Sequence, residues 1–269
     1  MLKYFYITNQ PDVARVADFA GVDRIFIDLE KNGKAERQPM DTVKNYHTLD
    51  DVKAVRPAVK NAELLVRVNP VFEGTQAEID TAIEYGADII MLPMWKTAQE
   101  VKYVLNIIGD RAKLLPLLET DEAANCADEV LEIDGVDEIH IGLNDLSISQ
   151  GKKFLFELLV DGTVDALAEK CKAKGVSFGV GGVGTVGSNF ALSAENIFAE
   201  HYRLGSDMVI LSRSFCKREE FDSFNDFERE FNKRLKANRE FEQFLSVQNS
   251  DYFNNIHNKT TEIIRELIK

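Results

Sequence analysis

Eight short apolar segments, each followed by a longer amphipathic one, restrict the fold of this chain more than any other feature of its sequence. The short segments are almost continuously apolar, as in KLLPLLE at 113–119, which is typical of parallel strands covered on both faces. We expect strands at Lys3–Ile7, Arg24–Leu29, Glu63–Asn69, Asp88–Pro93, Lys113–Glu119, Glu138–Leu143, Ser177–Val183 and Asp207–Ser212.

The amphipathic segments have helical periodicity, and glycines such as Gly21, Gly86 and Gly175 follow them where helices should end. Eight consecutive strand–helix units favour a closed (β/α)8 TIM barrel, an α/β fold, over an open doubly wound sheet, which usually has fewer strands. We expect helices at Pro11–Phe19, Leu49–Val59, Thr75–Tyr85, Ala98–Ile107, Asp121–Leu131, Thr163–Lys174, Ala194–Leu204 and from Phe221 onward.

The length of 269 residues exceeds that of an ordinary barrel, about 250 residues, by only a short extension. Beyond residue 216 the sequence becomes strongly charged with regularly spaced phenylalanines, which indicates helices. We therefore expect a barrel core at 1–218 and a C-terminal helical extension at 219–269 that packs on the barrel or on a neighbouring subunit.

The net charge of −13 argues against a nucleic acid or an anionic membrane as the main partner, because both favour basic surfaces. The three cysteines have no metal-binding spacing, and their sparseness indicates a reducing compartment. The N-terminus has no apolar signal region, and no run of 18 apolar residues occurs. We expect a cytoplasmic protein with no membrane or nucleic-acid partner.

Two carboxylates follow apolar strands at the end of a parallel barrel where functional residues gather. Glu119 ends the fifth strand, and Asp145 follows the sixth. Two carboxylates from neighbouring strands, completed by water and substrate oxygens, suit Mg²⁺ or Mn²⁺. The alternative is that each carboxylate caps the helix that follows it.

Two more candidates come from neighbouring strands. Arg67 lies inside an apolar strand and needs a carboxylate partner, either from a ligand or from Asp28 or Glu30. His47, after the second strand, is a candidate acid or base, although a loop histidine without a role is the alternative. The run GVGGVG at 179–184 belongs to the seventh strand, which favours backbone contact with an anionic ligand over dinucleotide binding.

These strand-end motifs resemble the metal-dependent pyruvate aldolase and citrate lyase β-subunit family (HpcH/HpaI), within the phosphoenolpyruvate/pyruvate barrel superfamily. The similarity runs from about residue 20 to residue 216. The matching motifs are IDLE at 27–30, VRVNP at 66–70, ADIIMLP at 87–93, LPLLET at 115–120 and IGLNDLS at 141–147.

The resemblance implies a homo-oligomeric barrel enzyme that acts on a 2-oxo acid, such as pyruvate or a phosphoenolpyruvate-like compound, together with an aldehyde. It implies that Glu119 and Asp145 bind Mg²⁺ or Mn²⁺ and that Arg67 binds substrate and neutralises the developing enolate. It also implies that the segment from Gly142 through Asn144 to Asp145 receives the substrate carboxylate. The expected activity is therefore divalent-metal-dependent carbon–carbon lyase or aldolase chemistry.

Two residues depart from the pattern of the pyruvate aldolases. Lys31 follows Glu30 where those enzymes carry a catalytic histidine, and Glu30, His47 or water could replace that base. Leu117 stands where they tend to have glutamine, as in the lyase β-subunit branch. Two alternatives therefore remain: an acyl-CoA lyase like that branch, or a non-catalytic barrel that binds phosphoenolpyruvate or another oxo acid.

Overall fold

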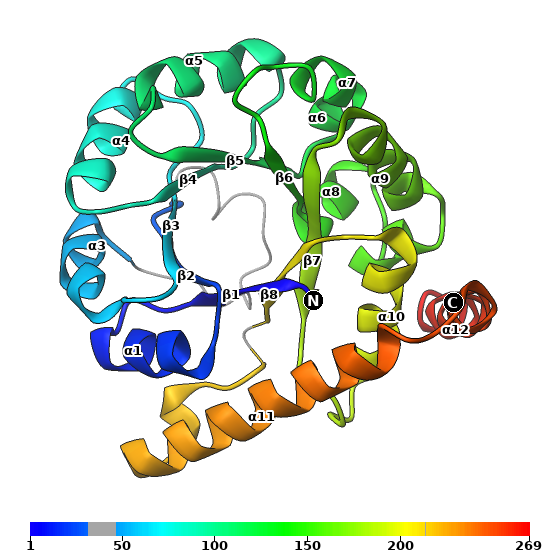
Figure 1. Cartoon of the computed structure of the whole chain (residues 1–269). Coiled ribbons are helices and arrows are strands. Elements are labelled where there is room, and N and C mark those ends of the chain that lie inside the picture. Colours follow the sequence, from blue (N-terminus) through cyan, green and yellow to red (C-terminus); the bar gives the residue numbers. More distant parts are fainter. Residues whose placement is uncertain (32–46, 213) are drawn as a thin grey trace.

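In the computed structural model, which describes residues 1–31, 47–212 and 214–269, eight parallel strands close into a barrel in chain order (Figure 1). This confirms the predicted TIM-barrel fold. Most strands end one or two residues earlier than expected. The strands are β1 (Lys3–Ile7), β2 (Arg24–Asp28), β3 (Glu63–Arg67), β4 (Ile89–Leu92), β5 (Lys113–Leu118), β6 (Glu138–Ile141), β7 (Ser177–Val183) and β8 (Met208–Leu211).

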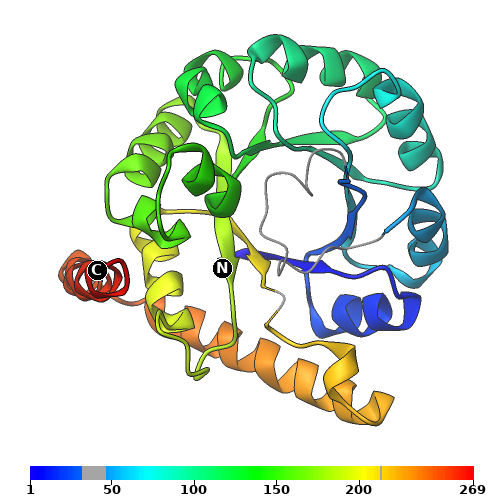
Figure 2. The ribbon, with the colours of Figure 1, turned by 180° about the vertical axis from the view of Figure 1, so that it is seen from behind.

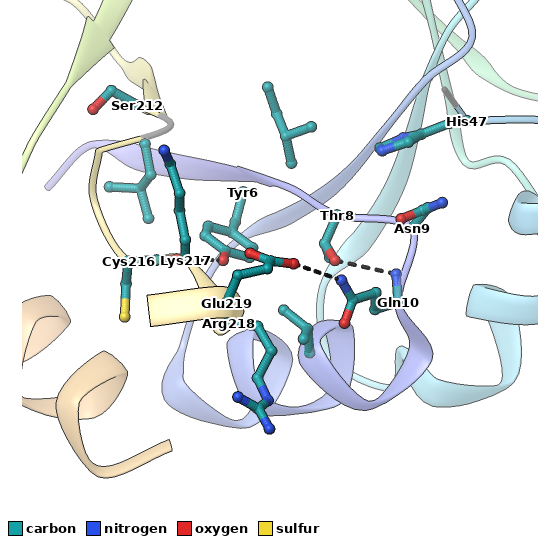
Figure 3. A pocket seen from close by; sticks show the side chains of 13 residues that line it. Tyr6, Thr8, Asn9, Gln10, His47, Ser212, Cys216, Lys217, Arg218 and Glu219 are labelled. Carbon is teal, nitrogen blue, oxygen red and sulfur yellow. Dashed lines mark hydrogen bonds between the residues drawn. The ribbon is translucent and has the colours of Figure 1, made fainter. Parts of the chain in front are cut away.

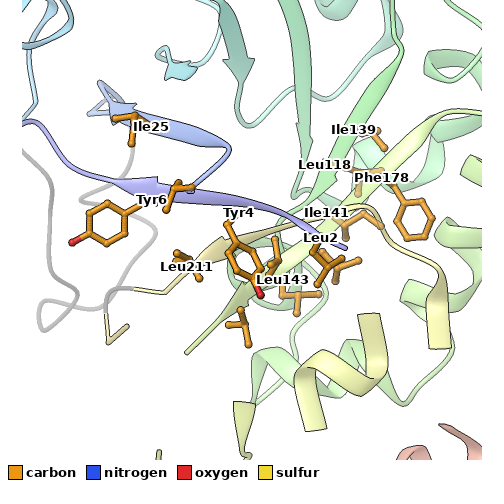
Figure 4. Close-up of a cluster of buried hydrophobic side chains, with 14 of the residues drawn as sticks. Leu2, Tyr4, Tyr6, Ile25, Leu118, Ile139, Ile141, Leu143, Phe178 and Leu211 are labelled. Atoms are coloured by element: carbon orange, nitrogen blue, oxygen red, sulfur yellow. The ribbon is translucent and has the colours of Figure 1, made fainter. Parts of the chain in front are cut away.

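Helices surround the barrel on the outside (Figure 1). Their apolar faces pack against the outward side chains of the strands, and this is where the larger core lies (Figure 4). The helices are α1 (Pro11–Ala20), α3 (Leu49–Val55), η1 (Arg56–Ala58), α4 (Thr75–Glu84), α5 (Ala98–Ile108), α6 (Asp121–Asn125), α7 (Ala127–Val130), α8 (Leu143–Ser149), η2 (Leu155–Leu159), α9 (Thr163–Lys174), α10 (Ala194–Leu204), η3 (Arg218–Glu220), α11 (Phe224–Leu245) and α12 (Ser250–Leu267).

The helical prediction was wrong in detail at several places, of which three lie in the barrel between residues 49 and 149. The segment 49–59 changes from α3 to the 3-10 turn η1 at Arg56, next to Pro57. The segment 121–131 divides at Cys126 into α6 and α7. Helix α8 was not predicted at all: Leu143, expected to end a strand, is its first residue.

Alternate residues of the strands point into the barrel and fill it in layers. The middle of the barrel is apolar, with a buried cluster of Phe5, Phe26, Leu65, Ile89, Met91, Leu115, Leu117 and Met208. At the N-terminal end of the strands the buried Arg24 pairs with Glu63 (3.1 Å) and Glu138 (2.5 Å). Each glutamate also pairs with a lysine: Lys113 Nζ lies 2.6 Å from Glu63, and Lys3 Nζ lies 2.8 Å from Glu138. This charged layer closes one end of the barrel, so a ligand has to enter from the other end.

The C-terminal helices pack on the barrel's own helices. Helix α11 lies against α1 and α10, and α12 lies against α10 (Figure 2). Glu242 of α11 is fully buried and accepts hydrogen bonds from the Leu2 amide (2.6 Å) and the Tyr4 hydroxyl (2.5 Å), which joins α11 to the first strand. Among the helices of the described residues, none has the length and apolarity needed to cross a bilayer.

Candidate functional site

Arg67 is fixed by two carboxylates at the C-terminal end of β2. The strand register places Arg67 directly beside Asp28. Its Nε and Nη2 donate to the two Asp28 oxygens at 2.9 and 2.8 Å, and Nη2 lies 3.3 Å from Glu30 Oε2. The guanidinium also lies over the Phe26 ring at 5.5 Å. The ion pairs that were considered as an alternative role therefore exist, and they orient a side chain that still lines a cavity.

The charges around Arg67 keep it protonated. Burial lowers the pKa of Arg67, but the negative charges of Asp28 and Glu30 outweigh burial and raise the pKa well above its ordinary value. Within the described residues, Nε and Nη2 make these contacts with Asp28 and Glu30, and Nη1 donates to no protein acceptor. Nη1 is thus available to a ligand oxygen.

Glu119 follows β5 and is 3% exposed. Its Oε1 accepts a hydrogen bond from the Met94 amide at 3.1 Å. Met94 has a φ of 53°, the only positive value of a non-glycine residue in the described ranges. Such a backbone costs about 1–2 kcal/mol, and here it turns the amide toward the carboxylate. The cap of the following helix is Thr120, whose side chain accepts from Ala123, so the capping alternative for Glu119 was wrong.

Asp145 lies on the next strand–helix connection. Helix α8 begins after Gly142, its N-cap residue, and Asp145 stands in its first turn. A Cβ atom on Gly142 would lie 2.9 Å from Glu119 Cβ and 3.0 Å from its Oε2. Glycine at this position therefore lets the two carboxylate-bearing segments approach each other.

The buried carboxylates repel one another. Burial and the charges of Glu30 and Asp145 together raise the pKa of Glu119 to about 8, against the opposing effect of Arg67. A divalent cation would offset this repulsion, and carboxylate oxygens are the ligands that Mg²⁺ and Mn²⁺ prefer. The donor set of Glu119 and Asp145 thus fits such a cation.

The protein would supply only part of the coordination shell. In the part of the chain that the structure describes, no three His, Cys, Asp or Glu side chains gather into a metal site. A cation at Glu119 and Asp145 would therefore take its other ligands from water and from a bound oxo acid.

A cavity of about 490 Å³ joins most of the predicted site residues at the C-terminal end of the strands. Glu30 adjoins this cavity through its ion pair with Arg67. His47 lines a neighbouring pocket instead, where its Nδ1 accepts a hydrogen bond from the Asp28 amide at 3.0 Å. The predicted residues that line the cavity itself are Arg67, Glu119, Gly142, Asn144 and Asp145.

His140 of β6, which was not among the predicted site residues, also lines this cavity. The ring is fully buried, and its Nε2 is 3.0 Å from the Gly181 carbonyl. Burial lowers the pKa of His140 to about 4, so the ring is neutral at neutral pH. Gly181 has a φ of 46° and lies where the register of β7 against β8 shifts. The inward position of His140 on β6 was the signal that sequence reasoning passed over.

The glycine-rich segment of β7 contributes backbone to the same cavity. Gly181 and Gly182 line it, together with Ser212 and Ser214 from the segment after β8. The expected close approach of this backbone to a ligand is therefore geometrically available, although it stays a prediction.

The comparisons with known proteins agree on a family and a fold. A family model described as HpcH/HpaI aldolase/citrate lyase matches residues 2–180. Among curated proteins, the chain is 24% identical over 227 residues to a 2-keto-3-deoxy-L-rhamnonate aldolase of Salmonella gallinarum, covering 65% of this chain and 79% of the relative. It is 25% identical over 169 residues to the protein of the same name from Escherichia coli, covering 52% and 58%.

Two solved structures have a similar fold at low sequence identity. An HpcH/HpaI aldolase from Desulfitobacterium hafniense superposes with a TM-score of 0.59 at 17% identity, covering 78% of this chain and 86% of that one. The citrate synthase SbnG superposes with a TM-score of 0.61, also at 17% identity, covering 89% and 94%. These two likenesses concern the fold alone.

Proposed function

This chain belongs to the HpcH/HpaI aldolase/citrate lyase family, and on that premise we propose that it is a divalent-metal-dependent carbon–carbon lyase acting on a 2-oxo acid. The observation that carries the proposal is the shared cavity of Arg67, Glu119 and Asp145. The similarity to 2-keto-3-deoxy-L-rhamnonate aldolases supports an aldol reaction with a pyruvate-type enolate over the acyl-CoA alternative.

Glu119 and Asp145 would hold Mg²⁺ or Mn²⁺. When bound, the metal ion would stabilise negative charge on the enolate oxygen. Arg67 adds a second positive charge, which Asp28 holds in place through two hydrogen bonds. Because Arg67 is already oriented, little reorganisation is needed as negative charge develops on the substrate. The amides at the start of α8, around Gly142 and Asn144, would receive the substrate carboxylate.

Cleavage of an aldol also requires a base that removes the proton of the hydroxyl group. Glu30 is in contact with Arg67 at 3.3 Å, whereas His47 lies in the neighbouring pocket. We therefore assign the base to Glu30 first and to His47 second.

The metal site is tested by calorimetry of pyruvate binding with and without Mn²⁺, on the wild type and on Asp145→Asn. Loss of one of two charged ligands should weaken metal-dependent binding about 100-fold or more. Asp226→Asn is a matched control, because Asp226 also lies in the first turn of a helix but outside the cavity. Equal binding by Asp145→Asn and the wild type would refute the metal site.

The base is tested by turnover of pyruvate with an aldehyde in Glu30→Gln and His47→Asn. Loss of a general base should lower kcat by about 10²–10⁴-fold. If neither substitution lowers kcat, the assignment of the base to these two residues is wrong.

A further inference from the structure

A second pocket of about 280 Å³ adjoins the cavity. It lies between the segment after β1 and the segment after β8, and Figure 3 shows its labelled side chains. Ile7, Leu211 and Ser212 line both spaces, so a molecule in the cavity that extends past these residues reaches the second pocket.

The second pocket has polar groups as well as apolar ones in its wall, and hydrogen bonds hold several of the polar side chains in place. Thr8 Oγ1 accepts a hydrogen bond from the Gln10 amide at 3.1 Å, and Gln10 Nε2 donates to Glu219 Oε1 at 3.1 Å. Asn9 and His47 add an amide and an imidazole. These hydrogen-bonding groups suit the hydroxyl groups of a substrate chain.

Lys217 brings a positive charge to the lining of this pocket, and Glu219 brings a negative one. Among the described residues no carboxylate forms an ion pair with Lys217, and Glu219 Oε1 accepts the hydrogen bond from Gln10 Nε2. Figure 3 shows the Lys217 side chain extending toward Ser212, whereas the Arg218 guanidinium points away from the other labelled residues. Arg218 donates instead to the Phe221 carbonyl at 2.6 Å.

A third space, which also adjoins the cavity, differs in chemistry. It measures about 310 Å³, shares Ser212 and Ser214 with the cavity, and is walled by Phe154, Phe156 and Phe190. An apolar substrate chain would favour this space, and a hydroxylated or anionic chain would favour the pocket of Lys217.

We propose that the pocket of Lys217 is the subsite for the part of the substrate beyond the carbon–carbon bond that reacts, and that it selects a hydroxylated chain ending in a phosphate or a carboxylate. The proposal rests on the proposed lyase function. Lys217 binds the anionic end, and the polar groups of Thr8, Asn9 and Gln10 bind the hydroxyl groups.

The subsite is tested first by binding alone, with 3-phosphoglycerate as the probe in calorimetry. Because a hydrogen bond to a charged group is stronger than one between neutral groups, Lys217→Met should raise the Kd of the probe at least about tenfold. Lys236→Met is the matched control, since Lys236 is an exposed lysine on α11 outside the pocket. An unchanged Kd in Lys217→Met would overturn the proposal.

Turnover measurements then distinguish a phosphate from a carboxylate as the anionic end. They also distinguish failure of the subsite from failure of the lyase function. With pyruvate as donor, the kcat/KM of glyceraldehyde 3-phosphate and of succinic semialdehyde is compared with that of neutral glyceraldehyde. Lys217→Met should lower the ratio of kcat/KM for the anionic acceptor to kcat/KM for neutral glyceraldehyde at least tenfold. This should hold for the phosphate, the carboxylate or both. A constant ratio for both acceptors overturns the subsite even if turnover proceeds. Lys217-dependent binding of the probe without any turnover refutes the lyase function and leaves the anion subsite standing.

Discussion

The buried carboxylate of Glu119 should make the metal-free protein less stable as the pH rises toward 8. Burial and the charges of Glu30 and Asp145 together raise the pKa of Glu119 from 4.5 to about 8. Between these two pH values the folded chain keeps a proton that the unfolded chain has lost. The free energy of unfolding therefore falls with increasing pH through this window.

The size of the effect follows from the same linkage. One proton difference corresponds to about 1.4 kcal/mol for each pH unit, so the loss across the window is on the order of 5 kcal/mol. The buried histidines His140 and His201 titrate in the opposite sense, because burial lowers their pKa values to about 4 and about 3. For this reason the contribution of Glu119 has to be measured as a difference between two proteins.

The assay is urea unfolding of the wild type and of Glu119→Gln in the presence of a chelator, at pH values from 5 to 9. The stability of the variant relative to the wild type should increase by about 1.4 kcal/mol for each pH unit up to about pH 8 and then stay constant. Glu122→Gln is the matched control, because Glu122 is an exposed glutamate on the helix that follows.

The raised pKa of Glu119 also predicts how the affinity for a metal should depend on pH. Because a carboxylate has to lose its proton to bind a cation, the apparent affinity for Mn²⁺ should rise about tenfold for each pH unit below 8. A stability difference between Glu119→Gln and the wild type that is constant from pH 5 to pH 8 would refute the reasoning for both effects.

Two further substitutions test the packing of the cavity. Gly142→Ala places a Cβ 2.9 Å from Glu119 Cβ, so urea unfolding should show a loss of about 1–3 kcal/mol and calorimetry a weaker binding of Mn²⁺. The control Gly184→Ala has nothing nearer than 3.7 Å to its new Cβ, and an equal loss there would contradict the crowding argument. His140→Leu removes the hydrogen bond to the Gly181 carbonyl, and we expect pyruvate binding to weaken by about tenfold while stability changes by less than about 1.5 kcal/mol. Unchanged pyruvate binding would show that this contact does not shape the cavity.

The sequence alone determined the barrel and the end of the barrel at which polar side chains gather. Both follow from local patterns: apolar runs mark the strands, and glycines mark the ends of helices such as α1 and α9. Because the strands are parallel, residues such as Arg67, Glu119 and Asp145, which lie near strand ends in the sequence, share one cavity in space. The roles of these residues in catalysis and metal binding stay predictions.

Only the tertiary structure decided which atoms meet within that cavity. The Met94 amide donates to Glu119 because Met94 has a positive φ, which no pattern in the sequence predicts. His140 on β6 contacts the Gly181 carbonyl on the neighbouring strand β7, and the pocket of Lys217 combines segments that are some two hundred residues apart in the chain. Such contacts depend on strand register and on the closure of the barrel, which are set by the packing of the whole chain and not by the local sequence.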